Sequence, residues 1–172
     1  FLVTHYLLLY TYTMKLDAAL PPVQLKDVPA IAKAAEAIGF DALWTQETQH
    51  DPFLPCTLIA EHTSLLNFGT AIAVSFARSP ANLAYTAWDL AAQSSGRFML
   101  GLGTQVKAHV ERRFGMTWPE SVTGKLREQI QVIRAFWESF RFTLRELIQS
   151  WQNLQANCVK AFMLIHFTVQ NI

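Results

Sequence analysis

From position 69 the sequence reads Gly69-Thr70-Ala71-Ile72-Ala73-Val74-Ser75-Phe76, a nearly unbroken apolar run. Such a run is typical of a parallel strand that is covered on both faces. It is followed by Ser79-Pro80, a pair that favours the start of a helix. The small residues inside the run also favour a bulge or a close approach of another backbone, with plain core packing as the simpler alternative. The run therefore predicts one strand-then-helix unit of an α/β fold.

The same unit repeats at a spacing of roughly 25–30 residues between Met14 and Arg141. Further strands are predicted over residues 15–20, 40–45 and 97–102. Helices are predicted over residues 28–38, 79–94 and 122–139. The inward face of the first of these helices is predicted to consist of Val28, Ile31, Ala32, Ala35 and Ile38. The inward face of the third is predicted to consist of Leu126, Ile130, Ile133 and Trp137. Gly39 stands where a helix end favours glycine. Four such units begin either an open doubly wound sheet or a (β/α)8 barrel, and a complete barrel takes about 250 residues.

The two ends of the chain differ from the middle. Residues 1–13 precede the first Met, Met14, and lack the basic region and cleavage site of a signal peptide. We interpret them as an extraneous extension, with an extra edge strand as the alternative. Between residues 142 and 172 apolar residues recur at helical spacing, which predicts a helical tail, at Leu144, Leu147, Ile148, Trp151 and Leu154.

The composition excludes several classes of protein. The 172 residues are 51% hydrophobic and 16% charged with a net charge of +1, which argues against a disordered chain. Apolar runs are too short for a membrane span, and the near-neutral charge offers no footprint for nucleic acid. We therefore expect neither a membrane nor a nucleic-acid partner. Cys56 and Cys158 are too few for a disulfide framework, so the expected location is the reducing cytoplasm.

A polar stretch follows the second predicted strand. In both α/β architectures ligands and catalytic groups gather at the carboxyl ends of the strands. Glu47 and His50 are therefore candidates for hydrogen bonding or acid–base chemistry, with a plain polar loop as the alternative. His50, Asp51, Glu61 and His62 match no known ligand spacing, so we expect no metal site.

Two glycines, Gly101 and Gly103, lie where the fourth predicted strand passes into the following turn. They would let the backbone approach a ligand closely, but the third glycine of a dinucleotide fingerprint is missing, so a tight turn is the alternative. The basic residues between positions 107 and 113 are interrupted by Glu111 and predict a solvated helix face. Cys56, beside Pro55 in an apolar stretch, is expected to be a buried and inert thiol.

Five short motifs, taken in order, resemble the luciferase-like monooxygenase superfamily, which holds bacterial luciferase and the deazaflavin (F-420)-dependent oxidoreductases. They read GFDALW at 39–44, ETQHDPF at 47–53, LNFGTAI at 66–72, RSP at 78–80 and GRFMLGLGT at 96–104. The resemblance covers about residues 14–141, which correspond to the first half of the family's barrel. It is greatest to the F-420-dependent branch.

The resemblance implies a partial (β/α)8 TIM barrel of four units, which holds a flavin or deazaflavin ring over the carboxyl ends of its strands. It also implies a non-prolyl cis peptide at Ala71-Ile72, behind the ring. The turn at Gly103, Thr104 and Gln105 would lie near the cofactor. The family's acidic position after the second strand corresponds to Glu47, and His50 is the second expected polar contact.

The expected function is that of a luciferase-like oxidoreductase of the monooxygenase class, with F-420 or alternatively FMN as cofactor and a small organic substrate. None of the family's second half follows residue 141, so we interpret residues 142–172 as a non-family tail and the chain as truncated. The alternative is an inactive half barrel that only self-associates, because its open strand edges invite pairing. We expect a homo-oligomer. A flavodoxin-like module ranks last, because residues 21–24 contain no glycine for a phosphate loop.

Overall fold

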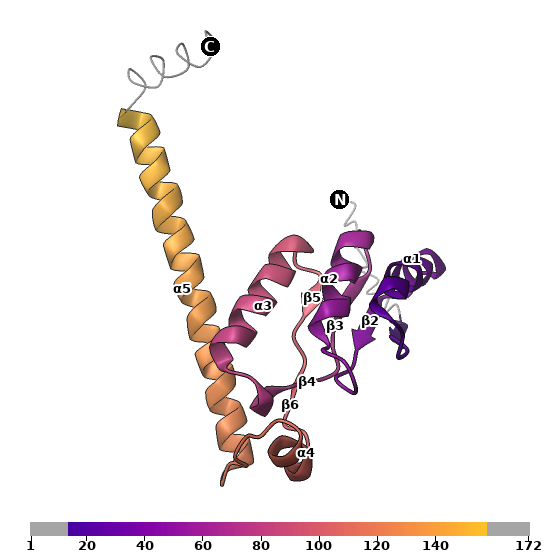
Figure 1. Cartoon of the computed structure of the whole chain (residues 1–172). Helices are drawn as coiled ribbons and strands as arrows, with labels where there is room; N and C mark the ends of the chain where they lie inside the picture. The colour runs from indigo at the N-terminus through magenta and orange to yellow at the C-terminus, as the bar shows by residue number, and fades with distance from the viewer. Residues whose placement is uncertain (1–13, 158–172) are drawn as a thin grey trace, which may run out of the picture. The chain divides into compact units, whose positions relative to one another are not determined.

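The computed structural model describes residues 14–157 of the chain (Figure 1). The expected extension at residues 1–13 and the end of the expected tail, residues 158–172, lie outside the described residues. Two compact units are present: residues 14–74 with 86–105, and residues 75–85 with 106–157. In the described part of the chain no helix is long and apolar enough to cross a membrane.

The first unit is built on a parallel sheet. Strand β1 (Asp17–Ala19) pairs with β2 (Ala42–Thr45), β2 pairs with β3 (Asn67–Thr70), and β3 pairs with β5 (Phe98–Met99). Each strand therefore lies beside the next one along the chain. A doubly wound sheet reverses this order at a switch point, whereas a (β/α)8 barrel keeps it. The observed order matches the barrel.

Helices cover this sheet between successive strands. A short 3-10 turn, η1 (Leu25–Asp27), leads into α1 (Val28–Ile38), and α2 (Phe53–His62) follows β2. Helix α1 packs against α2, and α2 packs against β2 and β3. Gly39 ends α1 in the left-handed conformation (φ 95°) as predicted, and its N–H donates to carbonyls of the last turn.

The predicted inward face of α1 is only partly buried. Val28, Ala32 and Ala35 are buried, and Ile31 is half-buried. Ile38 is 72% exposed, so its assignment to that face is corrected. Ile38 is the last residue of the helix, next to the glycine at which the chain turns away.

The third and fourth predicted strands are each broken in two, which corrects the continuous strands expected over 69–76 and 97–102. After β3 the Ala71–Ile72 peptide bond is cis, as the resemblance implied. The chain resumes as β4 (Ala73–Val74) and then forms a 3-10 turn, η2 (Ser75–Ala77). After β5 it resumes as β6 (Leu102–Gly103), and β4 pairs with β6 in a separate parallel ladder.

Close backbone contact explains the small residue at the start of the apolar run. A Cβ atom on Gly69 would lie 2.2 Å from the carbonyl oxygen of Met99 and 2.9 Å from Cζ3 of Trp44. Any larger residue would therefore push β3 away from β5, its partner in the sheet. The predicted close approach is confirmed, and plain core packing does not account for this glycine.

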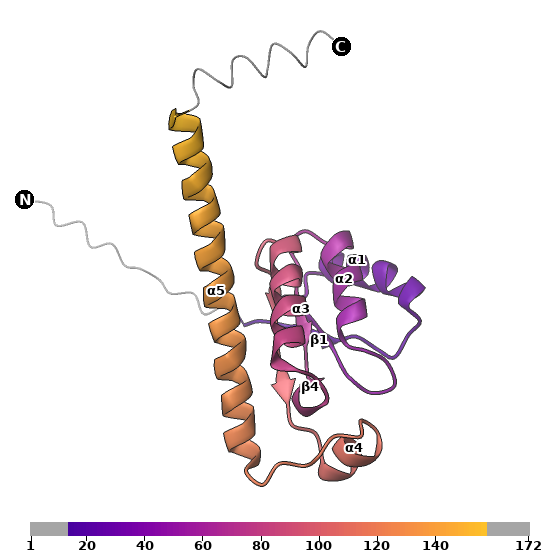
Figure 2. The same cartoon turned by 60° about the vertical axis from the view of Figure 1, so that its left-hand side comes forward.

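The second unit contains α4 (Lys107–Arg112), α5 (Val122–Asn157) and the first turns of α3 (Pro80–Gln93). The Ser79 hydroxyl accepts the N–H of Asn82, as expected of an N-cap. Helix α4 is exposed on most of its surface, as predicted for the basic segment. Figure 2 shows α5 as one uninterrupted helix, so the helix predicted to residue 139 and the described part of the predicted tail are continuous.

A buried amide on α5 holds the turn that follows β4. The side-chain nitrogen of Gln129 donates to the carbonyl oxygens of Ser75 (2.9 Å) and Arg78 (3.1 Å). The Ser75 hydroxyl donates to the Gln129 side-chain oxygen at 2.5 Å. Hydrophobic periodicity identifies the apolar neighbours of Gln129. It could not identify this contact, because a glutamine does not contribute to a pattern of apolar residues.

Candidate functional site

The carboxyl ends of β3 and β5 are joined by the side chain of a single threonine. The buried Thr70 hydroxyl accepts the N–H of Gly101 (3.0 Å) and donates to the Gly101 carbonyl (2.7 Å). The same carbonyl accepts the N–H of Ala73 at 2.9 Å. Thr70 therefore replaces the backbone ladder where both strands break, and it holds Gly101 in place beside the cis peptide.

Residues predicted around a cofactor lie at this edge of the sheet. The pairing of Val74 with Gly103 brings the segment after the cis peptide beside the turn at residues 103–105. A Cβ atom on Gly103 would lie 2.7 Å from Cγ1 of Ile72, so this glycine makes room for the isoleucine. Ala71 is exposed, and Ile72 is half-buried. The edge thus presents the small side chain of Ala71 to solvent, with Ile72 partly covered beside it.

The polar part of this edge is the turn that follows β6. Thr104 and Gln105 are half-buried there. The Thr104 hydroxyl donates to the Gln105 carbonyl at 3.2 Å, and Gln105 adopts a left-handed conformation with φ 60°. The structure therefore brings all five predicted cofactor residues, Ala71, Ile72, Gly103, Thr104 and Gln105, to one edge of the first unit.

Glu47 lies at the same edge but is turned toward the protein. Its side chain is 8% exposed, and its Oε2 atom accepts the backbone N–H of Val74 at 2.6 Å. A charged acceptor makes this a strong hydrogen bond. Glu47 thereby connects the loop after β2 to β4, directly after the cis peptide. The contact orients backbone rather than facing a ligand.

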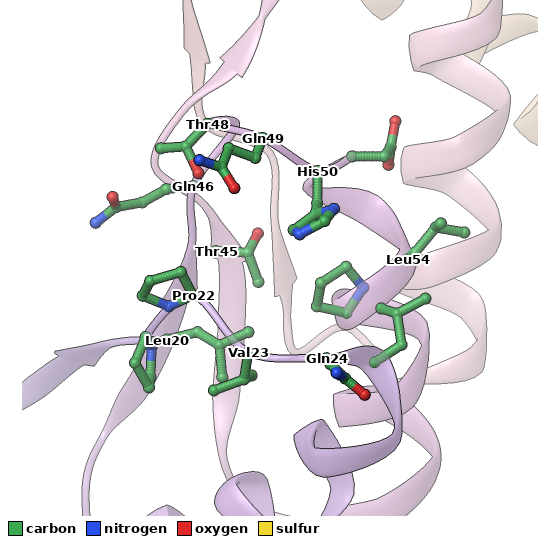
Figure 3. A pocket seen from close by; sticks show the side chains of 14 residues that line it. Leu20, Pro22, Val23, Gln24, Thr45, Gln46, Thr48, Gln49, His50 and Leu54 are labelled. Atoms are coloured by element: carbon green, nitrogen blue, oxygen red, sulfur yellow. The ribbon is translucent and has the colours of Figure 1, made fainter.

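His50 lines a separate groove with a volume of about 700 Å³ (Figure 3). The groove lies between the loop after β1 and the loop after β2, and its wall combines apolar and polar side chains. It is lined by Leu20, Pro21, Pro22, Val23, Gln24, Leu25, Thr45, Gln46, Thr48, Gln49, His50, Asp51, Leu54 and Pro55.

The two predicted catalytic residues are therefore in different surroundings. His50 is exposed in the groove, whereas neither Glu47 nor any of the five predicted cofactor residues lines it. Sequence reasoning missed the contribution of residues 20–25, because Pro21-Pro22 indicated only the end of a strand. The residues of this loop are mostly apolar and do not indicate a binding role by themselves. Their role becomes apparent only because the fold places them opposite His50. Within residues 14–157 no three His, Cys, Asp or Glu side chains lie close enough together to hold a metal ion.

Cys56, on α2, is fully buried, as expected of an inert thiol. Burial, with a smaller contribution from the charge of Asp51, raises the pKa of its thiol to about 12, and a hydrogen bond with Thr45 opposes the shift. Because the thiolate is the reactive form, this environment suppresses the chemistry of Cys56.

We expect native Cys56 to react with an aromatic disulfide reagent roughly 1,000-fold more slowly than in the urea-unfolded chain, because about three pKa units separate the two states. The measurement is the rate of thiol modification in a Cys158→Ser background, with Cys56→Ser as the blank. Because the pKa of Cys56 is higher in the folded chain, the unfolded chain releases the thiol proton at a lower pH than the folded chain does. Stability from the neutral thiol is therefore complete below about pH 9 and falls as pH rises toward 12. Equal rates in the native and unfolded states would contradict the expectation.

Comparison with known proteins gives a consistent assignment. A family model described as luciferase-like monooxygenase matches residues 5–153. The uncharacterized protein Rv1360 of Mycobacterium tuberculosis is 49% identical over 124 residues, which are 72% of this chain and 36% of that protein. An F420-dependent glucose-6-phosphate dehydrogenase of Amycolatopsis mediterranei is 29% identical over 127 residues, covering 66% of this chain and 38% of the enzyme. This chain thus spans little more than a third of the length of either relative.

A solved structure shows the same fold. The oxygenating constituent of 3,6-diketocamphane monooxygenase from Pseudomonas putida, in complex with FMN, superposes with a TM-score of 0.65. The superposition covers 73% of this chain and 40% of the monooxygenase, at 18% identity. At this identity the likeness concerns the fold alone. It supports the barrel order of the four-stranded sheet, β1-β2-β3-β5.

Proposed function

Because the chain belongs to the luciferase-like monooxygenase family, we propose that the edge formed by residues 71–72 and 103–105 binds the ring of a deazaflavin or flavin cofactor. F-420 is the proposed cofactor, since relatives of this chain include F420-dependent enzymes. FMN is the alternative, since it is bound in a protein of the same fold. The proposal rests on one observation: residues 71–72 and residues 103–105 lie close together beside Thr70 and Gly101.

The residues present at this edge fit a flat aromatic ring. Ala71 is small and exposed, and Ile72 is fixed against Gly103, so the surface offers apolar area without a bulky obstacle. Thr104 and Gln105 supply a hydroxyl and an amide at the border of this surface, where ring heteroatoms need partners. Binding sites for cofactors commonly combine such an apolar platform with a few polar groups.

In this proposal Glu47 is a positioning residue. By accepting the N–H of Val74, its carboxylate holds the backbone that carries Ile72. His50 would contact a small organic substrate from the groove, where its imidazole can form a hydrogen bond. When bound, the ring supplies the capacity for hydride transfer or oxygenation, and the protein supplies orientation and exclusion of water.

We expect the Ala71→Leu substitution to weaken cofactor binding by about tenfold or more, because the added methyl groups occupy the space proposed for the ring. The measurement is a fluorescence titration of the folded chain with F-420, and with FMN in parallel. Ala37→Leu is the matched control, since Ala37 is also exposed but lies on α1 away from this edge. Its affinity should equal that of the wild type.

Two results would contradict the proposal. One is the absence of saturable binding of either cofactor by protein whose circular dichroism shows it to be folded. The other is equal affinity of the Ala71→Leu and Ala37→Leu variants, which would place the ring elsewhere. Saturable binding of one cofactor only would identify which of the two the chain accepts.

A further inference from the structure

The groove beside His50 is formed entirely within the first unit. Its residues come from the segment that follows β1, from the loop that follows β2 and from the first turn of α2. Hydrogen bonds hold both sides of the groove in place. The N–H of Leu20 donates to the Trp44 carbonyl at 2.8 Å, and the Thr45 hydroxyl donates to the Pro52 carbonyl at 2.8 Å. The shape of the groove therefore follows from contacts between the sheet and the loops at its edge.

One side of the groove is apolar, and the other carries hydrogen-bonding groups. Figure 3 shows Leu20, Pro22 and Val23 along one side, with Thr48 and His50 along the other. The side chains of the first three residues are hydrocarbon and offer neither a donor nor an acceptor. The opposite side offers a hydroxyl group and an imidazole. A ligand that fits both sides is mainly apolar and carries a hydrogen-bonding group at one end.

The groove contains no lysine or arginine. Among the described residues that line it, only His50 and Asp51 are ionisable, and Asp51 is an acid. Lys26 comes directly after Leu25, which lines the groove, but Lys26 itself does not. Asp51 is held in place because its Oδ1 atom accepts the N–H of Phe53 at 2.8 Å. A phosphate or carboxylate ligand would lose hydration beside this acid and would find no cationic partner in exchange.

A ligand in the groove would lie next to the edge that we propose for the cofactor ring. Thr45 lines the groove, and its carbonyl oxygen accepts the N–H of Ala71 at 2.7 Å. Ala71 is one of the residues to which we assign the ring. The two sites therefore adjoin through one backbone hydrogen bond within the first unit. Such an arrangement holds a substrate and a ring side by side, as a reaction between them requires.

We propose that this groove selects an uncharged and mainly apolar organic substrate with one hydrogen-bonding oxygen, such as an alcohol or a ketone. That the ligand is a substrate rests on the proposed function, whereas its chemical class rests on the walls of the groove alone. The volume of about 700 Å³ accommodates a compound with two fused rings. Phosphorylated and carboxylated molecules are disfavoured, because the walls supply no cation to pair with them.

The test compares two probes that share one hydrocarbon and differ in charge. At neutral pH 2-naphthol is uncharged, whereas 2-naphthyl phosphate is an anion. We expect the full chain, without cofactor, to bind 2-naphthol about tenfold more tightly than the phosphate in calorimetric titrations. Gln49→Lys adds a cation to the wall of the groove, so it should strengthen binding of 2-naphthyl phosphate by about tenfold.

Two exposed leucines test the location of the bound probe. Leu54 lines the groove and is 54% exposed, whereas Leu65 is 82% exposed, follows α2 and does not line the groove. Leu54→Gln should weaken binding of 2-naphthol by about fivefold, because it removes apolar contact from the groove. Leu65→Gln is the matched control and should leave the affinity unchanged. Circular dichroism checks that both variants are folded.

Any of four results would overturn this assignment. They are equal or tighter binding of the phosphate by the wild type, no saturable binding of 2-naphthol by the folded chain, no gain in phosphate affinity for Gln49→Lys, and equal affinities of the two leucine variants. Failure of F-420 and FMN to bind would contradict the proposed function alone, because the 2-naphthol titration contains no cofactor. Cofactor binding together with a preference for the phosphate would overturn only the class of ligand proposed for the groove.

Discussion

Replacing Gly101 by alanine is expected to lower the free energy of unfolding by about 3 kcal/mol or more, a large part of the stability of an ordinary domain. The new Cβ atom would lie 1.9 Å from the Thr70 carbonyl oxygen, and that oxygen belongs to backbone that cannot rotate away. Separation of the two segments would also break both hydrogen bonds between the Thr70 hydroxyl and Gly101. Each such buried group left unsatisfied costs about 1–3 kcal/mol.

The measurement is urea denaturation followed by circular dichroism. Gly96→Ala is the control, because a Cβ atom at Gly96 meets nothing within 4 Å although its φ is 86°. That variant should lose about 1 kcal/mol, from backbone strain alone. If both variants lose the same free energy, the contact between Gly101 and Thr70 does not limit stability. Gly101→Ala should also abolish the cofactor binding that we propose, because the segment that carries Ala71 would be displaced.

Replacing Arg97 by alanine is expected to cost about 4 kcal/mol, through loss of a complete set of hydrogen bonds. All five N–H donors of its guanidinium are used, at donor–acceptor distances of 2.6–3.1 Å. Nε donates to the Ser94 carbonyl, and Nη1 donates to the Thr63 hydroxyl and the Leu66 carbonyl. Nη2 donates to the carbonyls of Ala60 and Thr63. Its guanidinium carbon also lies 5.5 Å from the centre of the Phe68 ring. One side chain thus joins the end of α2, the start of β3 and the start of β5.

A second substitution distinguishes geometry from charge. Arg97→Lys keeps the positive charge but offers three donors without the planar fork, so it should recover less than half of the lost free energy. Arg112→Ala, on the exposed surface of α4, serves as the control and should change the stability by no more than about 0.5 kcal/mol. Full stability of Arg97→Lys would show that the charge matters and the hydrogen-bond geometry does not. Denaturation midpoints in urea decide between these outcomes.

Much of the local structure could be predicted because it depends on neighbouring residues. The end of α1 at Gly39 and the start of α3 at Ser79-Pro80 follow from backbone preferences that act over one turn. The cis peptide at Ala71-Ile72 and the family were inferred from motifs, and both are confirmed. The buried thiol at Cys56 followed from its apolar surroundings.

Other features could not be predicted, because they join residues that are distant along the chain. The breaks in the third and fourth strands depend on the Thr70 hydroxyl, whose partner is 31 residues away. Glu47 was identified as a polar group at a strand end, but its partner, the N–H of Val74, is a backbone atom without any sequence signature. The groove beside His50 exists only because the apolar loop that follows β1 lies opposite the loop that follows β2.

The residue pattern was thus sufficient for the α/β class and for the helix ends. These depend on hydrophobic periodicity and on conformational preferences within a few residues. The tertiary structure decided which of the candidate side chains face outward and which orient backbone, as it did for His50 and Glu47. That distinction depends on hydrogen bonds between separate strands and loops, because a buried polar group must find its partner wherever the fold places one.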